Sequence, residues 1–159
     1  MYKLIQITII SSLLYGCGFH LAGEGNFATE LNNTHIQSTS SSNEMLRLLE
    51  KNLRSNQINV VGAESATALL RILHEETEKV VLTVDSDGKA REFELLLRIT
   101  FEVKRVDNTV LLDQQVIDLN RDFVFNKSDL LGTNEEEQEL FSEMRNDAAK
   151  LIVYRLQTI

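Results

Sequence analysis

The sequence predicts an α+β domain in which two helices pack on one face of a four-stranded mixed β-sheet with long meander strands. Two patterns lead to this prediction. Apolar residues recur at every second position through most of residues 66–125, which is typical of β-strands. Two other stretches, at 41–56 and 133–159, carry apolar residues at helical spacing. Two helices on one face of a sheet are the simplest way to bury all these apolar faces together.

The strands are expected in two groups. A short strand at 34–37 comes before the first helix, and a right-handed crossover should place it parallel to the strand that follows. Residues 58–61 are expected to be extended, with Gly62 ending the segment. Three long strands follow, at 66–84, around 93–103 and at 110–125, joined by turns at Asp87-Gly88 and at 107–109. These strands are far longer than the usual ~5–6 residues, so the hairpins should extend past the helices.

The middle strand has the clearest pattern of the three. Phe93, Leu95, Leu97, Ile99, Phe101 and Val103 should face the core, and the charged and polar residues between them should face away. The first and third long strands instead have polar middles, at Glu75–Lys79 and around 113–116. Such a pattern is typical of an edge strand or of a strand that faces a partner.

The first helix is expected to begin with a capping box formed by Ser41 and Glu44. Its predicted buried residues are Met45, Leu46, Leu49 and Leu53. The second helix is expected to begin with Thr133 and Glu136 as its cap, and its acidic first turn suits the helix dipole. Its predicted buried residues are Leu140, Phe141, Met144, Ala148, Leu151 and Ile152.

The N-terminus resembles a bacterial lipoprotein signal. Lys3 precedes a short apolar run that is too short for a ~20-residue membrane span, and Leu14-Tyr15-Gly16-Cys17 follows it. We therefore expect a signal peptide at 1–16, a lipidated tether at 17–33 and one domain at 34–159. Lipidation explains the single cysteine, and Gly18 after it is typical of outer-membrane sorting. The alternative is an uncleaved anchor in which Cys17 is an incidental small hydrophobic residue.

Composition and motifs restrict the function. The net charge of −8 argues against nucleic acid, which requires a basic face. The three histidines form no metal-binding pattern, and the sequence has no catalytic or phosphate-loop motif. We therefore expect no enzyme activity and no cofactor, apart from the covalent lipid on Cys17.

Four basic residues are candidate anion contacts in this acidic chain. Lys89 and Arg91 follow the first hairpin turn, while Arg121 and Lys127 flank Phe123 and Phe125. On a strand, Lys89 and Arg91 would leave the same face. The alternative is that these residues only solvate exposed strand ends.

Three segments resemble the LPS-assembly lipoprotein LptE family. They are CGFHL at 17–21, DGKAREFELLLRITFEV at 87–103, and the stretch from Arg121 to Leu156, which contains EMRNDAA. Where basic residues can occur in that family, this sequence has Ser86-Asp87 and Thr133. An anion contact would then depend on Lys89, Arg91 or Lys127.

The resemblance implies an outer-membrane lipoprotein with an α+β fold. Such a protein would plug and help assemble the LptD-type β-barrel, bind lipopolysaccharide (LPS), and take part in its transport to the cell surface. Two other functions stay open: a free lipid-anchored carrier of one amphiphile, and a structural lipoprotein without a barrel partner. The long strands with polar faces favour the barrel partner, because a carrier needs a closed apolar cavity.

Overall fold

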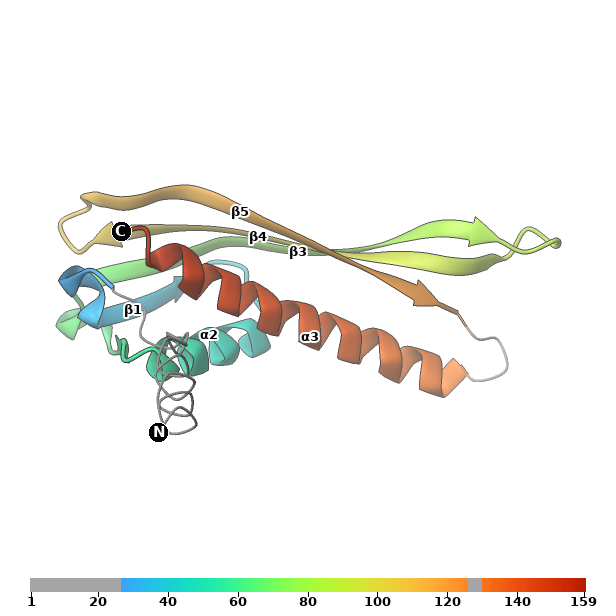
Figure 1. Ribbon diagram of the computed structural model, residues 1–159, viewed down its shortest axis with the longest axis horizontal. Helices are drawn as coiled ribbons and strands as arrows, with labels where there is room; N and C mark the ends of the chain where they lie inside the picture. The colour runs from blue at the N-terminus through green and yellow to red at the C-terminus, as the bar shows by residue number, and fades with distance from the viewer. Residues whose placement is uncertain (1–26, 126–129) are drawn as a thin grey trace, which may run out of the picture.

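The computed structural model describes residues 27–125 and 130–159. The strands form one sheet in the order β2-β1-β3-β4-β5, with β1 parallel to both its neighbours and β3, β4 and β5 antiparallel. Both helices lie on one face of this sheet (Figure 1). The elements are η2 (Thr29–Asn32), β1 (Asn33–Ser38), α2 (Asn43–Ser55), β2 (Asn59–Val60), η3 (Ala63–Ser65), β3 (Ala68–Val84), β4 (Ala90–Arg105), β5 (Val110–Val124) and α3 (Leu130–Leu156).

The predicted α+β class with two helices on a mixed sheet is confirmed, but the sheet has five strands instead of four. The additional strand is β2, which lies in the segment expected to be extended. Asn59 and Val60 pair with Asn33 and Thr34 of β1, so a two-residue segment becomes the sheet edge. So short a strand has no periodicity of its own, and only its neighbour makes it a strand.

The three long strands form an arm that extends away from the helix-covered base. β1 pairs with β3 only as far as Ile72, whereas β3 continues to Val84. We call residues 74–100 and 116–125 the arm. Figure 1 shows the β3–β4 hairpin reaching beyond the end of α3, as the strand lengths predicted.

Each hairpin turn is stabilised by an aspartate side chain. The Asp85 carboxylate accepts hydrogen bonds from the backbone N–H groups of Asp87 and Lys89, and Gly88 has a φ of 74°. In the second turn Asp107 accepts from the backbone N–H of Thr109, and Asn108 has a φ of 69°. Gly and Asn are the residues that adopt this left-handed conformation most readily.

The core lies between the sheet and the two helices. Leu95, Leu97, Ile99, Phe101 and Val103 of β4 are buried, which confirms the predicted apolar face of that strand. Leu31 of η2 is also fully buried, so the end of the segment expected as a tether packs with the domain.

Both predicted helix starts are wrong. The N-cap of α2 is Ser42, whose hydroxyl accepts from the Met45 N–H, and not Ser41. With Ser42 as the cap, Glu44 lies one position before the site that a capping box requires, and its carboxylate binds Ser142 and Arg145 of α3. Thr133 lies inside α3, which begins at Leu130. In α2 the Glu75 carboxylate of β3 accepts from the Ser42 N–H, which is the contact that a capping box would have made within the helix.

The buried stripes agree in part with the prediction. Met45, Leu49 and Leu53 of α2 are buried, and Leu46 is half-buried. In α3, Leu151 is exposed, contrary to the prediction. Since α3 packs on the sheet and on α2 at once, its buried stripe is wide and lies to one side of Leu151. The buried residues of this helix are Met144, Ala148, Ala149, Ile152, Val153 and Leu156, beside Thr133.

A bulge in β3 explains the polar middle of this strand. The pairing with β4 shifts by one residue between Ile72 and His74. Beyond the shift Glu75 lies opposite core-facing Ile99, and Lys79 lies opposite Leu95. A one-residue slip moves side chains to the other face of a sheet. Glu75 and Lys79 therefore face the helices.

Candidate functional site

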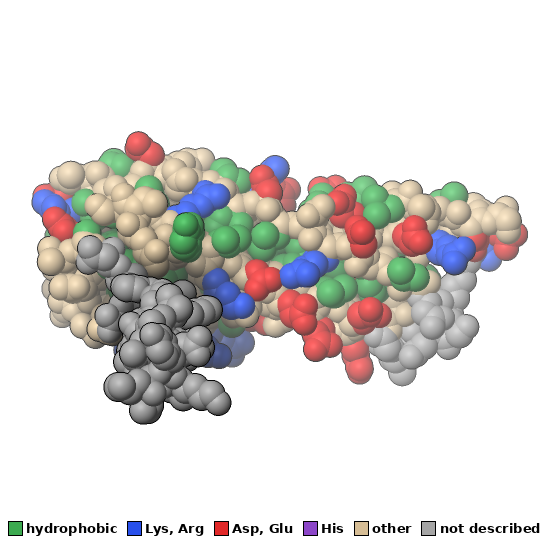
Figure 2. Space-filling view, viewed as in Figure 1, with side chains coloured by type: hydrophobic (Ala, Val, Ile, Leu, Met, Phe, Trp, Pro, Cys, Tyr) green, Lys and Arg blue, Asp and Glu red, His purple; other side chains and the backbone are tan. Residues whose placement is uncertain are grey.

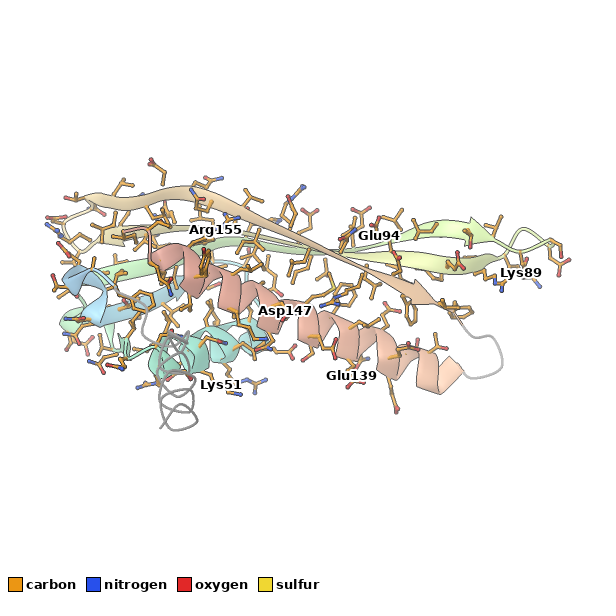
Figure 3. All side chains as sticks on the ribbon, in the orientation of Figure 1. Lys51, Lys89, Glu94, Glu139, Asp147 and Arg155 are labelled. Atoms are coloured by element: carbon orange, nitrogen blue, oxygen red, sulfur yellow. The ribbon has the colours of Figure 1, made fainter. Side chains whose placement is uncertain are left out.

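The tip of the arm carries two of the predicted basic residues. Lys89 lies in the turn before β4, at the far end of the molecule (Figure 3), and Arg91 lies in β4. Lys89 directly precedes β4, so the expectation that both side chains leave one strand face stays a prediction. Both residues are exposed, and among the described residues no carboxylate forms an ion pair with either. Their charges are available to an external anion.

An aromatic cluster lies between the tip and α3. The ring centroids of Phe93 and Phe123 are 6.3 Å apart, and Phe125 meets Phe93 edge-on at 6.0 Å. Phe123 is 2% exposed, while Phe93 and Phe125 are half-buried. The ring of Phe93 therefore packs inside the arm and is not a free ring at the tip.

Lys79 joins this cluster to α3. Its Nζ lies 4.3 Å from the Phe93 ring centroid and 5.0 Å from that of Phe123, and it forms an ion pair with Glu137. A cation over two ring faces is attracted by their quadrupoles. Lys79 thus links the arm to the N-terminal half of α3, and it was not among the predicted site residues.

The other two predicted basic residues differ from those at the tip. Arg121 lies opposite Leu95, on the helix side of β5, and donates to Asp147 of α3 at 2.9 Å. The carboxylate of Asp147, which Figure 3 labels on α3, also pairs with Lys150. Arg121 therefore has a counter-ion within the fold. Lys127 lies outside the described residues.

A network of charges ties α2, β3 and α3 together. Arg145 Nε donates to Glu75 at 2.7 Å, and its Nη1 donates to Glu44 at 3.2 Å. The same Glu75 carboxylate accepts from the backbone N–H of Ser42 at 2.7 Å. The side chains of Arg145 and Glu75 are only 17% and 5% exposed. Buried charges are retained only with partners, so this network holds the N-terminus of α2 in place.

This network was not predicted from the sequence, although two features of the sequence belong to it. Glu75 lies in the polar middle of a long strand, and Arg145 lies in the EMRNDAA segment. Neither feature could show that the two side chains meet, because 70 positions separate them.

The outer face of the arm, which faces away from the helices, is mainly acidic. Glu76, Glu78 and Asp118 lie around Arg98 there, and Glu94 lies further along β4 on the same face. A hydrogen bond to the Asp118 carboxylate raises the pKa of Arg98 above its usual value, so this guanidinium stays charged. Figure 2 shows acidic side chains gathered along the arm. An open hollow of about 330 Å³ lies on this face.

No group of three or more His, Cys, Asp or Glu side chains in 27–125 and 130–159 is arranged to hold a metal ion. Within the same ranges, none of the helices combines the length and the apolar character that a membrane crossing requires.

Comparison with known proteins gives the family. Residues 31–156 match the family described as LptE, lipopolysaccharide-assembly. The chain is 30% identical over 145 residues to the LPS-assembly lipoprotein LptE of Photorhabdus laumondii, covering 91% of this chain and 79% of that protein. It is 25% identical to the protein of the same name from Pectobacterium atrosepticum, over 91% of this chain and 78% of that one.

Solved structures show the same fold. A lipoprotein B from Nitrosomonas europaea superposes with a TM-score of 0.70 at 28% identity, covering 88% of each chain. The rare lipoprotein B from Shewanella oneidensis superposes with a TM-score of 0.67 at 25% identity, over 80% of this chain and 95% of that one.

Proposed function

This chain belongs to the LptE family of lipopolysaccharide-assembly lipoproteins, and on that premise we propose that it is the lipoprotein plug of an LptD-type outer-membrane β-barrel. In this role it helps the barrel to assemble, binds LPS and takes part in its transport to the cell surface. A lipid on Cys17 anchors it in the outer membrane. No catalytic step is part of the proposal.

The arm is the observation that most supports a barrel partner. It is formed by the outer parts of β3, β4 and β5, which are 17, 16 and 15 residues long in full, and it extends the domain well beyond α2 (Figure 1). The outer face of these strands is polar and charged, as expected for a surface that sits in a hydrated lumen and not in lipid. An elongated domain of this kind suits the inside of a large barrel.

The free-carrier alternative receives less support. A carrier would need an enclosed apolar cavity for acyl chains. The hollow on the arm is open, and charged side chains such as Glu76 and Arg98 line it beside leucines. The aromatic rings of the arm pack on one another and on Lys79.

For LPS we propose the tip residues Lys89 and Arg91 as the phosphate contacts. Both are exposed and lack an ion-pair partner among the described residues. A guanidinium binds phosphate through two parallel hydrogen bonds. Arg121 is a weaker candidate, because an external phosphate would have to compete with Asp147. Lys127 remains a candidate from the sequence.

Affinity purification of the full-length chain from detergent-solubilised membranes tests the proposed role. We expect an outer-membrane barrel protein of several times its mass to co-purify in equal molar amount. A lone lipoprotein carrying bound lipid would support the carrier. A lone lipoprotein without lipid would support a purely structural role.

A further inference from the structure

The outward edge of β3 is open along most of the arm. β1 pairs with this edge only from Ala68 to Ile72. Just after β1 ends, the Thr39 N–H donates to the Ile72 carbonyl and the Ser40 hydroxyl donates to the Leu73 carbonyl. Beyond that point no main-chain group on this edge from His74 to Val84 has a hydrogen-bond partner among the described residues. In the sheet order no strand lies beside this part of β3.

The open edge contains a regular run between two irregularities. The pairing of β3 with β4 shifts at Ile72/His74 and again at Val81/Thr83, and residues 74–81 between the shifts pair without interruption. A run of this kind is roughly 27 Å long at ~3.4 Å per residue. Alternate residues point their N–H and C=O groups away from β4. Such an edge is a template for another strand.

The side chains along the run indicate what it would accept. Glu76 and Glu78 lie on the outer face and are exposed, while Val81 is 49% exposed on the helix side. Arg98, opposite Glu76, already pairs with Asp118. Glu76 has His74 Nε2 at 3.9 Å, and no salt bridge joins Glu78 to another described residue. An added strand would therefore place its side chains beside two exposed carboxylates. Opposite charges on neighbouring strands stabilise the pairing.

We propose that the edge from His74 to Val81 binds an extended segment of the barrel partner as an additional β-strand. The segment carries Lys or Arg where it faces Glu76 and Glu78, and an apolar residue near Val81. This inference rests on the proposed function, because it names how the barrel holds this chain.

A second copy of this chain is a poorer occupant of the edge. An antiparallel pair of the two runs, centred on the run, sets Glu76 opposite Glu78 of the other copy or sets Glu78 opposite itself. Like charges that face each other across strands are destabilising. The net charge of −8 on each copy adds to this repulsion.

Amide hydrogen exchange, resolved to single residues by fragmentation mass spectrometry, tests the proposal. The full-length lipidated chain is compared in detergent alone and in the purified barrel complex. Alone, residues 74–81 should alternate between slow amides bonded to β4 and fast amides on the open edge. In the complex the fast set should slow by about a hundredfold or more, which abolishes the alternation. Coverage by a barrel wall without strand pairing would leave the alternation, and that result overturns the proposal.

A matched pair of charge reversals tests the chemistry of the partner segment. The two substitutions are Glu78→Lys and Glu94→Lys. Glu78 lies on the edge strand β3, and Glu94 lies on the central strand β4 of the same outer face. We expect Glu78→Lys to lower the amount of barrel protein that co-purifies by about fivefold. With Glu94→Lys this amount should stay close to that of the wild type. If both variants lose equal amounts of co-purified barrel protein, the whole outer face contacts the barrel, and the proposed contact along the edge of β3 is wrong.

The same preparation separates this inference from the proposed function. If the barrel co-purifies but the alternation persists, the strand addition is wrong and the proposed function stands. If no barrel co-purifies, both are wrong. A complex of two copies of this chain without a barrel would overturn both and would make the second copy the occupant.

Discussion

Arg145 shows how much one buried charge can determine in this fold. Its guanidinium neutralises Glu75 and Glu44 at the junction of β3, α2 and α3. The Glu75 side chain is 5% exposed, so water cannot replace the missing partner if Arg145 is removed.

Arg145→Ala should therefore lower the free energy of unfolding by about 3–5 kcal/mol, because it leaves an unpaired buried carboxylate. Arg98→Ala is the control, since both Arg98 and its partner Asp118 are more than half exposed. The loss of such a surface pair costs about 0–1 kcal/mol. Denaturant unfolding of both variants measures the difference. Similar small losses would show that the network contributes little to stability.

The basic residues at the tip give a second prediction at this scale. Lys89→Glu with Arg91→Glu should weaken LPS retention by the full-length chain, while the barrel complex still forms. The contact is exposed, so the difference between the wild type and this variant should shrink in high salt.

The matched control is Arg47→Glu with Lys51→Glu, which makes the same charge change on the exposed face of α2. Circular dichroism of both variants checks the fold. If the two double variants retain equal amounts of LPS, the tip is ordinary surface, and the search moves to Arg121 and Lys127.

At the scale of elements, β4 is the strand on which the arm and the base both depend. It pairs with β3 and β5 along nearly its whole length and has no open edge. Its two faces differ sharply, since Leu97 is 1% exposed in the core and Leu96 is half-buried on the outer face.

Leu97→Asn should cost about 3–5 kcal/mol of stability, because it removes apolar contacts and buries an amide without partners. Leu96→Asn makes the same chemical change one position away and should cost under about 1 kcal/mol. Thermal unfolding compares the two. Equal shifts in Tm would mean that the two faces of β4 are not distinguished as the structure describes.

At the scale of the whole molecule, we expect the lipid anchor to hold the protein at the outer membrane and the arm to contact the barrel. The lipobox at Leu14–Cys17 lies outside the described residues, so the anchor remains a prediction from the sequence. Acyl chains on a cysteine bind a membrane stably only when two or more signals combine.

Cys17→Ser should abolish lipidation and leave an uncleaved precursor outside the outer-membrane fraction. Fatty-acid labelling and membrane fractionation measure this. Ser12→Cys with Cys17→Ser is a suitable control, because it restores a thiol away from the cleavage site and should not restore labelling. Normal outer-membrane fractionation of Cys17→Ser would rule out lipidation at this residue as the anchor.

The amino-acid sequence by itself determined the features that depend on local periodicity. The alternation along β4, the long strands, the positions of the two hairpin turns and the two amphipathic helices were all predictable, because the side-chain pattern needs only neighbours along the chain. The family resemblance was also carried by short segments that the later comparison confirmed.

Only the tertiary structure decided which polar residues meet. The bulge before His74 turns Glu75 and Lys79 toward the helices, where Arg145 and Glu137 neutralise them. Arg145 also donates to Glu44 of α2. A charge pair between residues far apart in the chain leaves no periodic signal, since its energy depends on burial and distance in the folded molecule. For the same reason the open edge of β3 was visible only once β1 was seen to end at Ser38.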